Sequence, residues 1–454
     1  ETFTITLDDG NGGTVDRTVS VTITGTNDDP VVSADVTGGV TELVTATGNL
    51  TDSGTLTFTD VDLADTHSVS VTASSVGALG TLTPTVSADT DNGTGGEISW
   101  TYSVAASDVE YLAKDETKVE TFTITLDDGN GGTVDRTVSV TITGTNDRPT
   151  ITDTDVVGAV SEDANSLLLT DTGTVSFADA DATDLSNVTV ALKSTVQSVG
   201  GSVSTELATA LESAMTLSGA TSNAHQGVVD WGFALGNELT QYLAAGQTVT
   251  ATYTITVTDD SGATNAAATQ DVVITITGTN DDPVVSSADV TGGVTEKVTA
   301  PTGSLADSGT LSFTDVDLAD VHSISAVRPG EGVLGSLTAS VTTQASDVDG
   351  SGGVVTWNYS VAAGAVEYLA EGEQKVETFS FDVLDGNGGV VTRTVSVTVT
   401  GTNDRPTITA TDVVGGVSED GVQDDPSTTE VNESLWLTDM GTVSFADADA
   451  TDLS

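Results

Sequence analysis

One seven-residue motif, Thr-Gly-Thr-Asn-Asp-x-Pro, occurs four times in this chain of 454 residues and constrains its fold more than any other feature. The copies end at Pro30, Pro149, Pro283 and Pro406, so they lie 119, 134 and 123 residues apart. Repeats that stack into a solenoid have periods of about 20 to 50 residues, whereas these spacings match the size of whole domains. The sequence therefore predicts a string of separate domains, each with its own core.

The segments between the motifs alternate between two types, which we call A and B. Trp100 and Trp357 occupy equivalent positions in the two A segments, and residues 1–29 match residues 120–148 almost letter for letter. The unit of duplication is therefore an A–B pair. The predicted domains are the C-terminal part of an A domain at 1–29, A at 30–149, B at 150–283, A at 284–406 and the N-terminal part of a B domain at 407–454.

Each segment reads as a set of short strands. Apolar and polar residues alternate with period two in six runs of the first A segment, and turns rich in Gly, Asp and Asn separate the runs. Six or seven strands in about 120 residues are typical of an immunoglobulin-like sandwich. We therefore predict an all-β protein, built as an extended array of tandem β-sandwich domains. Trp100 is expected in a core. The runs are 31–36, 55–59, 67–72, 98–104, 120–126 and 133–143.

The B segment departs once from this pattern. Leu207, Leu211 and Met215 follow one another at helical spacing, and a Ser or Thr cap with Glu206 in the first turn supports a short helix near 204–215. We expect this helix to pack over the sandwich as an insertion.

The charge balance excludes several classes of protein. The chain has 68 Asp and Glu against 11 Lys and Arg, for a formal net charge of −57, and a surface of this sign is repelled by nucleic acid and by anionic membranes. It has no cysteine, which rules out disulfides and Cys-ligated metals, and three histidines leave little material for catalysis. No apolar stretch is long enough for a transmembrane helix, so we expect no membrane insertion. From the negative charge we expect no nucleic-acid binding.

The strand order predicts that acidic residues gather where two domains meet. If the first strand of a domain runs from top to bottom, Glu42 lies at the bottom of the first A domain, and Asp60 and Asp62 lie at its top after the second strand. The loop holding Asp115 and Glu116 lies at the bottom and the last hairpin at the top. Stacked domains would then bring the bottom of one, the linker and the top of the next together.

The candidate residues recur at four linkers. At 27–30 they are Asn27, Asp28, Asp60, Asp62 and Asp127; at 146–149, Glu42, Asp115, Glu116, Asn146, Asp147, Asp179, Asp181 and Asp259; at 280–283, Glu162, Asn280, Asp281, Asp315, Asp317 and Asp385; at 403–406, Glu296, Glu371, Glu373, Asn403, Asp404, Asp447 and Asp449.

These oxygen-only sets point to calcium, which takes six to eight oxygen ligands with tolerant geometry, whereas magnesium keeps its waters. Any single Asp here is explained as well by turn formation. The convergence at four linkers favours Ca²⁺ as the cofactor, bridging neighbouring domains of the same chain. The loops 89–93 and 347–350 are weaker candidates, because they lack a complete ligand set.

The run from Thr121 to Pro149 resembles the VCBS repeat of giant bacterial surface and secreted proteins, including RTX-type adhesins, and the wider pattern is similar to cadherin-like domains. Asn146-Asp147-Arg148-Pro149 matches the cadherin linker motif, Asp60 and Asp62 the Asp-x-Asp pair, and Glu42 and Glu162 the first-strand glutamate. The segment 111–116 loosely matches the acidic loop. The B segment has no acid at 241–247, which predicts weaker binding or fewer ions at 280–283, and no RTX nonapeptide is present.

The resemblance implies a calcium-stiffened stalk of an extracellular or cell-surface bacterial adhesin, serving attachment or biofilm formation, with adhesion ligands elsewhere on the parent protein. Two alternatives stay open. One domain type could bind a glycan or protein, for which Trp231 and Trp436 would have to be exposed, or chains could assemble laterally into a fibre. An enzyme is not expected, because a catalytic carboxylate pair is rarely duplicated at every linker, and His67 and His322 adjoin Ser68 and Ser323 without triad geometry.

Overall fold

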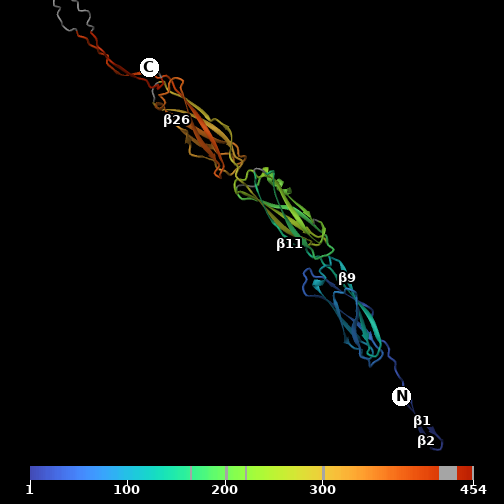
Figure 1. The fold of residues 1–454 in the computed structure, drawn as a ribbon. Helices are drawn as coiled ribbons and strands as arrows, with labels where there is room; N and C mark the ends of the chain where they lie inside the picture. The colour runs from blue at the N-terminus through green and yellow to red at the C-terminus, as the bar shows by residue number, and fades with distance from the viewer. Residues whose placement is uncertain (164–165, 200–202, 220–221, 299–301, 419–436, 452–454) are drawn as a thin grey trace, which may run out of the picture.

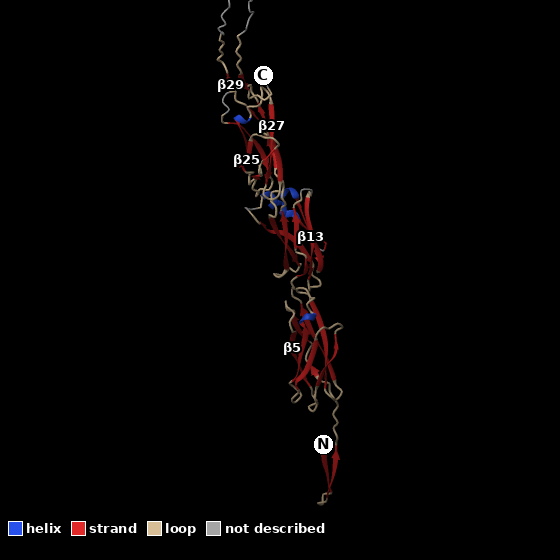
Figure 2. Cartoon of the chain, turned by 60° about the vertical axis from the view of Figure 1, so that its left-hand side comes forward, coloured by secondary structure: helices blue, strands red, loops and turns tan. Residues whose placement is uncertain are grey.

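The structure is a computed structural model that describes residues 1–163, 166–199, 203–219, 222–298, 302–418 and 437–451. Within these residues, three β-sandwiches follow one another end to end in an extended row, with a hairpin at the N-terminal end and a short two-stranded sheet after the last sandwich (Figure 1). Strands dominate throughout and helices are few and short (Figure 2). The prediction of an all-β chain of tandem sandwiches is confirmed.

The first sandwich packs two four-stranded sheets. The first strand is split between them, because β3 pairs with β5 in one sheet and β4 runs parallel to the last strand, β10, in the other. One sheet has the order β3 (Val31–Val32), β5 (Asn49–Thr59), β8 (Gly96–Ala105), β7 (Thr81–Ala88), and the other β4 (Val36–Thr41), β10 (Thr133–Thr143), β9 (Thr117–Asp127), β6 (Ser68–Ser74). The 3-10 helix η1 (Ala106–Asp108) follows β8.

The second sandwich repeats this plan and adds the helix. Its sheets are β11 (Thr150–Thr154), β13 (Leu168–Ala178), β17 (Gln226–Gly236), β15 (Met215–Gly219), and β12 (Val157–Ser161), β19 (Ala267–Thr277), β18 (Thr248–Thr258), β14 (Ser186–Gln197), β16 (Ser222–Ala224). The helix α1 (Thr205–Ala214) precedes β15, and η2 (Asn237–Leu239) follows β17.

The third sandwich has the plan of the first. Its sheets are β20 (Val284–Ala288), β22 (Ser304–Thr314), β26 (Gly353–Ala362), β25 (Ser336–Thr343), and β21 (Thr291–Thr295), β28 (Val390–Thr400), β27 (Gln374–Leu384), β23 (Ser323–Ile324), with β24 (Arg328–Pro329) also paired to β27. The short helix η3 (Ala363–Ala365) follows β26.

The N-terminal hairpin shows that apolar side chains stay exposed on a single sheet. The hairpin β1 (Thr2–Asp8) and β2 (Thr14–Ser20) leaves Phe3 and Ile5 52% and 59% exposed, whereas the equivalent Phe122 and Ile124 are buried against a second sheet. Burial of these side chains therefore comes from sheet-on-sheet packing. At the other end, β29 (Thr407–Thr411) pairs with β30 (Val443–Ala446).

Each core is centred on a tryptophan that faces a glycine. Trp100 lies directly opposite Gly54 on the neighbouring strand, and a Cβ at Gly54 would lie 2.5 Å from the indole ring. The same pair recurs as Trp231 with Gly173 and as Trp357 with Gly309. All three indoles are buried, as the alternation predicts for Trp100. Trp436 lies outside the described residues.

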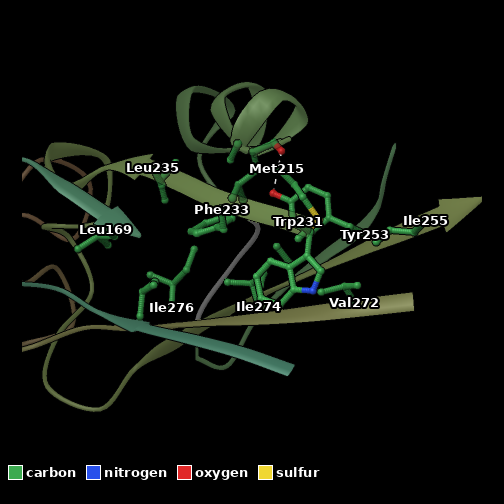
Figure 3. Packing of buried hydrophobic residues seen from close by; sticks show 14 of the residues in the cluster. Leu169, Met215, Trp231, Phe233, Leu235, Tyr253, Ile255, Val272, Ile274 and Ile276 are labelled. Atoms are coloured by element: carbon green, nitrogen blue, oxygen red, sulfur yellow. Dashed lines mark hydrogen bonds between the residues drawn. The ribbon is translucent and has the colours of Figure 1, made fainter. Parts of the chain in front are cut away.

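The predicted helix is present over the second core. The Ser204 side chain caps α1 by accepting a hydrogen bond from the Leu207 N–H, and Leu207, Leu211 and Met215 are buried. Figure 3 shows the helix above the core side chains, and the Tyr253 hydroxyl donates to the Leu211 carbonyl at 2.8 Å. The helix therefore closes the core of this sandwich.

Candidate metal centres at the junctions

Three junctions join the described sandwiches and the last sheet: the first around linker 146–149, the second around 280–283 and the third around 403–406. At each, a glutamate that follows the first strand is fixed by the linker. The Glu42 N–H donates to Thr143 O, and its carboxylate Oε2 accepts from Thr145 N–H at 2.8 Å. Glu162 and Glu296 make the same bonds with the next two linkers. One oxygen of each glutamate is thereby held in place, and the other oxygen of Glu42 and of Glu296 has no partner.

The Asp-x-Asp turn of the following sandwich meets the linker from the other side. Asp181 Oδ2 accepts a hydrogen bond from the Asp147 N–H at 2.8 Å. Equivalent bonds link Asp317 to Asp281, Asp449 to Asp404, and Asp62 to Asp28 at the 27–30 linker. Within each turn, the second Asp N–H donates to the first carboxylate, which fixes the spacing of the two groups.

The linker asparagine reaches the last hairpin of the following sandwich. Asn146 Nδ2 donates to Asp259 Oδ2 at 3.3 Å, and Asn280 Nδ2 donates to Asp385 Oδ2 at 2.9 Å. At 27–30 the partner of Asn27 is Asp128, at 2.7 Å. The sequence analysis names Asp127 at this position, but Asp127 ends β9 and bonds the nearby Gly129 N–H, whereas Asp128 is buried in the turn and contacts the linker.

The structure adds a glutamate that the sequence reading missed. Glu110 lies in the turn after η1 and forms, with Glu42 and Asp147, a group whose ligand oxygens all lie within 4.8 Å of one another. Glu367 does the same with Glu296 and Asp404 at the third junction. The signal was the repeated Glu-Tyr-Leu at 110–112 and 367–369, which stands just before the acidic loop that the sequence analysis names instead.

A third carboxylate after each Asp-x-Asp pair was also missed. Asp65 forms a compact group with Asp60 and Asp62, and Asp320 with Asp315 and Asp385. Asp184 is the equivalent residue at the first junction, where it lies near Asp259 and Glu116. The repeated spacing Asp-x-Asp-x-x-Asp could have revealed all three.

The acidic loop itself stays outside these groups. Asp115 is exposed in a turn with a φ of 63°, and Glu371 is exposed as well. Glu116 uses its carboxylate to accept bonds from Ala113 N–H and from Thr183, and Glu373 makes the matching bonds with Ala370 N–H and Thr451. The structure therefore places Glu116 and Glu373 in direct contacts across the first and third junctions.

The remaining candidates lie where the strand order puts them, with different burial. Asn146, Asp147, Asp179, Asp181 and Asp259 are all buried at the first junction. At the second, Asp315, Asp317 and Asp385 are buried, and Asn280 and Asp281 are partly exposed. At the third, Asp449 is buried, Asp404 and Asp447 are partly exposed, and Asn403 is exposed.

Buried junction oxygens lack partners, although buried polar atoms are normally hydrogen-bonded. Glu120, a buried acid inside the first sandwich, shows the normal case, because it accepts from Leu79 N–H, Gly80 N–H and the Tyr102 hydroxyl. The unpartnered atoms at the first junction are Glu42 Oε1, Glu110 Oε1, Asn146 Oδ1, Asp147 Oδ2, Asp179 Oδ2, Asp181 Oδ1 and Asp184 Oδ2. Those elsewhere include Asp65 Oδ2, Asn280 Oδ1, Asp281 Oδ2, Glu296 Oε1, Asp317 Oδ1, Asp320 Oδ2, Glu367 Oε1, Asp404 Oδ2 and Asp449 Oδ1.

The same carboxyl groups have raised pKa values. Burial, with the nearby charges of Asp147, Asp184 and Asp179, raises the pKa of Asp181 to about 8. Burial is also the main cause that raises the pKa of Glu42 and of Glu162 to about 7, of Asp317 to about 7, and of Asp147 and Asp179 to about 6. Desolvated carboxylates that repel one another are stabilised by a nearby cation. The donor set, oxygen alone and strongly negative, fits a hard divalent cation.

A histidine supports the Asp-x-Asp turn in the two A-type sandwiches. His67 is buried, its Nε2 lies 3.0 Å from Asp60 Oδ2, and its Nδ1 lies 2.7 Å from Asp89 Oδ1. His322 bridges Asp315 and Gln344 in the same way. Asp89 is thus engaged with a histidine, which weakens the loop 89–93 as a separate metal site.

Comparisons with known proteins give structural neighbours alone: no family model and no curated protein matches the chain. One neighbour is a structure of protocadherin gamma B2 extracellular cadherin domains 1–5, at 19% identity and a TM-score of 0.39. The match covers 87% of this chain, and the chain spans 64% of the length of that structure. Mouse cadherin-23 EC22–24 gives 17% identity, 84% and 100% coverage and a TM-score of 0.34. Drosophila N-cadherin EC1–4 gives 14% identity and a TM-score of 0.28, and the match covers 88% of this chain and 83% of that structure.

These TM-scores are low. The β-sandwich fold of this chain is established by its own sheet pairing. In the part of the chain that the structure describes, no helix is long and apolar enough to cross a membrane.

Proposed function

We propose that this chain is a calcium-stiffened extender, or stalk, of a large bacterial cell-surface or secreted adhesin that supports attachment or biofilm formation. One observation carries the proposal: at the first and third junctions, buried oxygens without partners come from the preceding sandwich, the linker and the segment that follows it, and at the second junction they come from the linker and the following sandwich. A cation bound to all three would restrict the angle between the sandwiches. The stalk would thereby hold a binding region at a distance from the cell.

Calcium is the proposed ion, because the sites offer many oxygens in an irregular arrangement. Magnesium requires near-octahedral geometry and gives up its waters reluctantly. Each ion that binds the folded chain alone would also stabilise it by mass action, by about 2.7 kcal/mol at a calcium concentration 100 times the dissociation constant. The bacterial and adhesin parts of the proposal are supported by the VCBS-like run at 121–149.

Small-angle scattering of the whole chain tests the stalk. In calcium, the maximum dimension should be larger and the flexibility lower than in chelator, because the ions neutralise the junction carboxylates and bridge the sandwiches. Equal scattering curves in the two conditions would rule out a calcium-stiffened stalk.

Calorimetry tests the ligand assignment at the first junction. The double variant Asp179→Ala, Asp181→Ala should bind at least one calcium ion fewer per chain. Asp153→Ala, Asp155→Ala is the matched control, since both residues are exposed on the same sandwich at the same spacing and the charge change is equal. An unchanged stoichiometry in the first variant would contradict the assignment.

The alternative of a glycan-binding or protein-binding module needs an exposed aromatic patch on the second sandwich. Trp231 does not supply it, because the indole is buried and its Nε1 donates to the Asp155 carbonyl at 2.7 Å. No observation here favours this alternative over the stalk.

A further inference from the structure

The second junction differs from the other two beside the glutamate that follows the first strand. Gln241 stands where Glu110 and Glu367 stand, each directly before Tyr-Leu. The Gln241 amide Nε2 donates a hydrogen bond to Glu162 Oε1. At the other junctions, the matching oxygens, Glu42 Oε1 and Glu296 Oε1, are buried and have no partner.

The substitution removes a metal group on one side of the junction. At the first and third junctions, the glutamate pair and the linker Asp hold their oxygens within 4.8 Å of one another. Among the residues that the structure describes, the second junction has such a group only on the side of the following sandwich, at Asp315, Asp320 and Asp385. In the orientation that donates to Glu162, the Gln241 amide presents its nitrogen, which does not ligate a cation, at the position where Glu110 and Glu367 present a carboxylate.

The first and third junctions also share direct hydrogen bonds that the second junction lacks among the described residues. At the first junction, Ala182 N–H donates to Tyr111 O at 3.2 Å and the Thr183 hydroxyl donates to Glu116 at 3.1 Å. The third junction repeats both bonds with Ala450 and Tyr368 and with Thr451 and Glu373.

At the second junction, both members of the Thr–Glu pair are replaced. Gln247 stands in place of Glu116, and Ala319 stands in place of Thr183. Within the described ranges, no hydrogen bond joins Tyr242 or Gln247 to the third sandwich. The A-to-B and B-to-A junctions are therefore built differently, in metal ligands and in protein contacts.

We propose that Gln241 makes the second junction bind one cation fewer than the first and third, so that in calcium the array bends at B-to-A junctions and each A–B pair moves as one rigid unit. This inference rests on the proposed function, because it requires that calcium fills the junctions. The repeat of the sequence, an A–B pair, would then also be the mechanical repeat of the stalk.

Calcium counting in the full chain tests the role of Gln241. Gln241→Glu should bind one calcium ion more per chain than the parent, and Glu110→Gln, its mirror image, one fewer. Gln270→Glu is the matched control, since the same chemical change lies within β19 on the body of the same sandwich, and it should leave the count unchanged. If Gln241→Glu gains no ion while Glu110→Gln loses one, the inference is wrong and the proposed function stands.

Spin-label distances test the bend, and the absence of cysteine makes labelling selective. Thr101→Cys with Thr189→Cys spans the first junction, and Thr189→Cys with Asn358→Cys spans the second; all three positions are exposed. In calcium, the distance distribution should be narrow across the first junction and broad across the second, and Gln241→Glu should narrow the second. If calcium narrows both distance distributions equally in the parent chain, relative to chelator, the inference alone is wrong. If calcium narrows neither distribution, the proposed function is wrong as well.

Discussion

The junction glutamates show how one residue can be both fixed and available. The backbone of the linker holds one carboxylate oxygen of Glu42, and the other is buried with no partner. In such an arrangement the ligand is already ordered before an ion binds. Its cost is a desolvated negative charge in the free protein.

This cost predicts a reversed pH dependence in chelator. The carboxyl groups of Asp181, Glu42 and Asp317 have folded-state pKa values of about 7 to 8, above their ordinary values near 4, so the folded chain binds their protons more tightly than the unfolded chain. Their contribution to stability is full below about pH 4 and is lost as the pH rises through 7 to 8. The melting temperature in chelator should therefore fall between pH 5 and pH 8.

Calcium should remove this dependence, because the ion binds the ionised carboxylates and competes with protons. Thermal scans across the same pH range, with and without calcium, measure both effects. A chelated chain whose melting temperature rises steadily toward pH 8 would show that these carboxylates are not desolvated. Asp179→Ala, Asp181→Ala should weaken the dependence relative to Asp153→Ala, Asp155→Ala.

His67 gives a second prediction at this scale. It contacts Asp60, Asp89 and the ring of Phe58, whose centroid lies 4.7 Å from its own. His67→Ala should destabilise the chain by about 2 to 4 kcal/mol, because it leaves a cavity and a buried carboxylate without its partner. Chemical denaturation measures the change. His225→Ala, at a partly exposed site, is the control and should cost less than about 1 kcal/mol.

The sequence was sufficient for residues that lie directly at the end of a regular strand. Strand parity placed Glu42, Asp60 and Asp181 at the correct ends. It failed where a turn decides the direction of a side chain, as with Asp128 beside Asp127. It also failed at Glu110, because the 3-10 turn that carries it toward the linker has no periodic signal.

At the scale of elements, the glycine facing each tryptophan sets the close approach of two strands. Gly54→Ala should cost about 1 to 3 kcal/mol of unfolding free energy, because its Cβ would overlap the Trp100 ring. Gly39→Ala is the control: the nearest atom, Thr141 O, would lie 3.4 Å away, and the cost should be under about 1 kcal/mol. Equal costs for the two variants would contradict the close-packing account.

Strand existence followed from alternation, and the helix followed from its cap and apolar spacing. The split of each first strand between two sheets did not, since alternation does not say which neighbour a strand pairs with. The edge strand of the third sandwich is another case. Its counterpart β6 is continuous, whereas β23 and β24 are separate short pieces, with Pro329 in the second. Pro329 itself is paired opposite Phe379, and the interruption lies before it, at 325–327.

At the scale of the whole molecule, the net charge of −57 acquires a location. Many of the acids that lie at junctions are buried, and divalent ions there would lower the effective charge of the array. Magnesium at equal ionic strength should leave the scattering profile close to that in chelator, because it does not take irregular all-oxygen sites without its waters. Full extension in magnesium would show that screening alone stiffens the chain.

The parallel pairing of the second half of each split first strand with the last strand decides how the array carries tension. In the first sandwich, β4 and β10 pair over Val36–Thr41 and Val138–Thr143, and β12 with β19 and β21 with β28 repeat the arrangement. A pull on the two ends of a sandwich draws these neighbouring strands in opposite directions along their length. The ladder is then loaded in shear, so that all its hydrogen bonds resist together and none opens first. A chain under flow or traction would thus be strongest along the axis on which its sandwiches are strung.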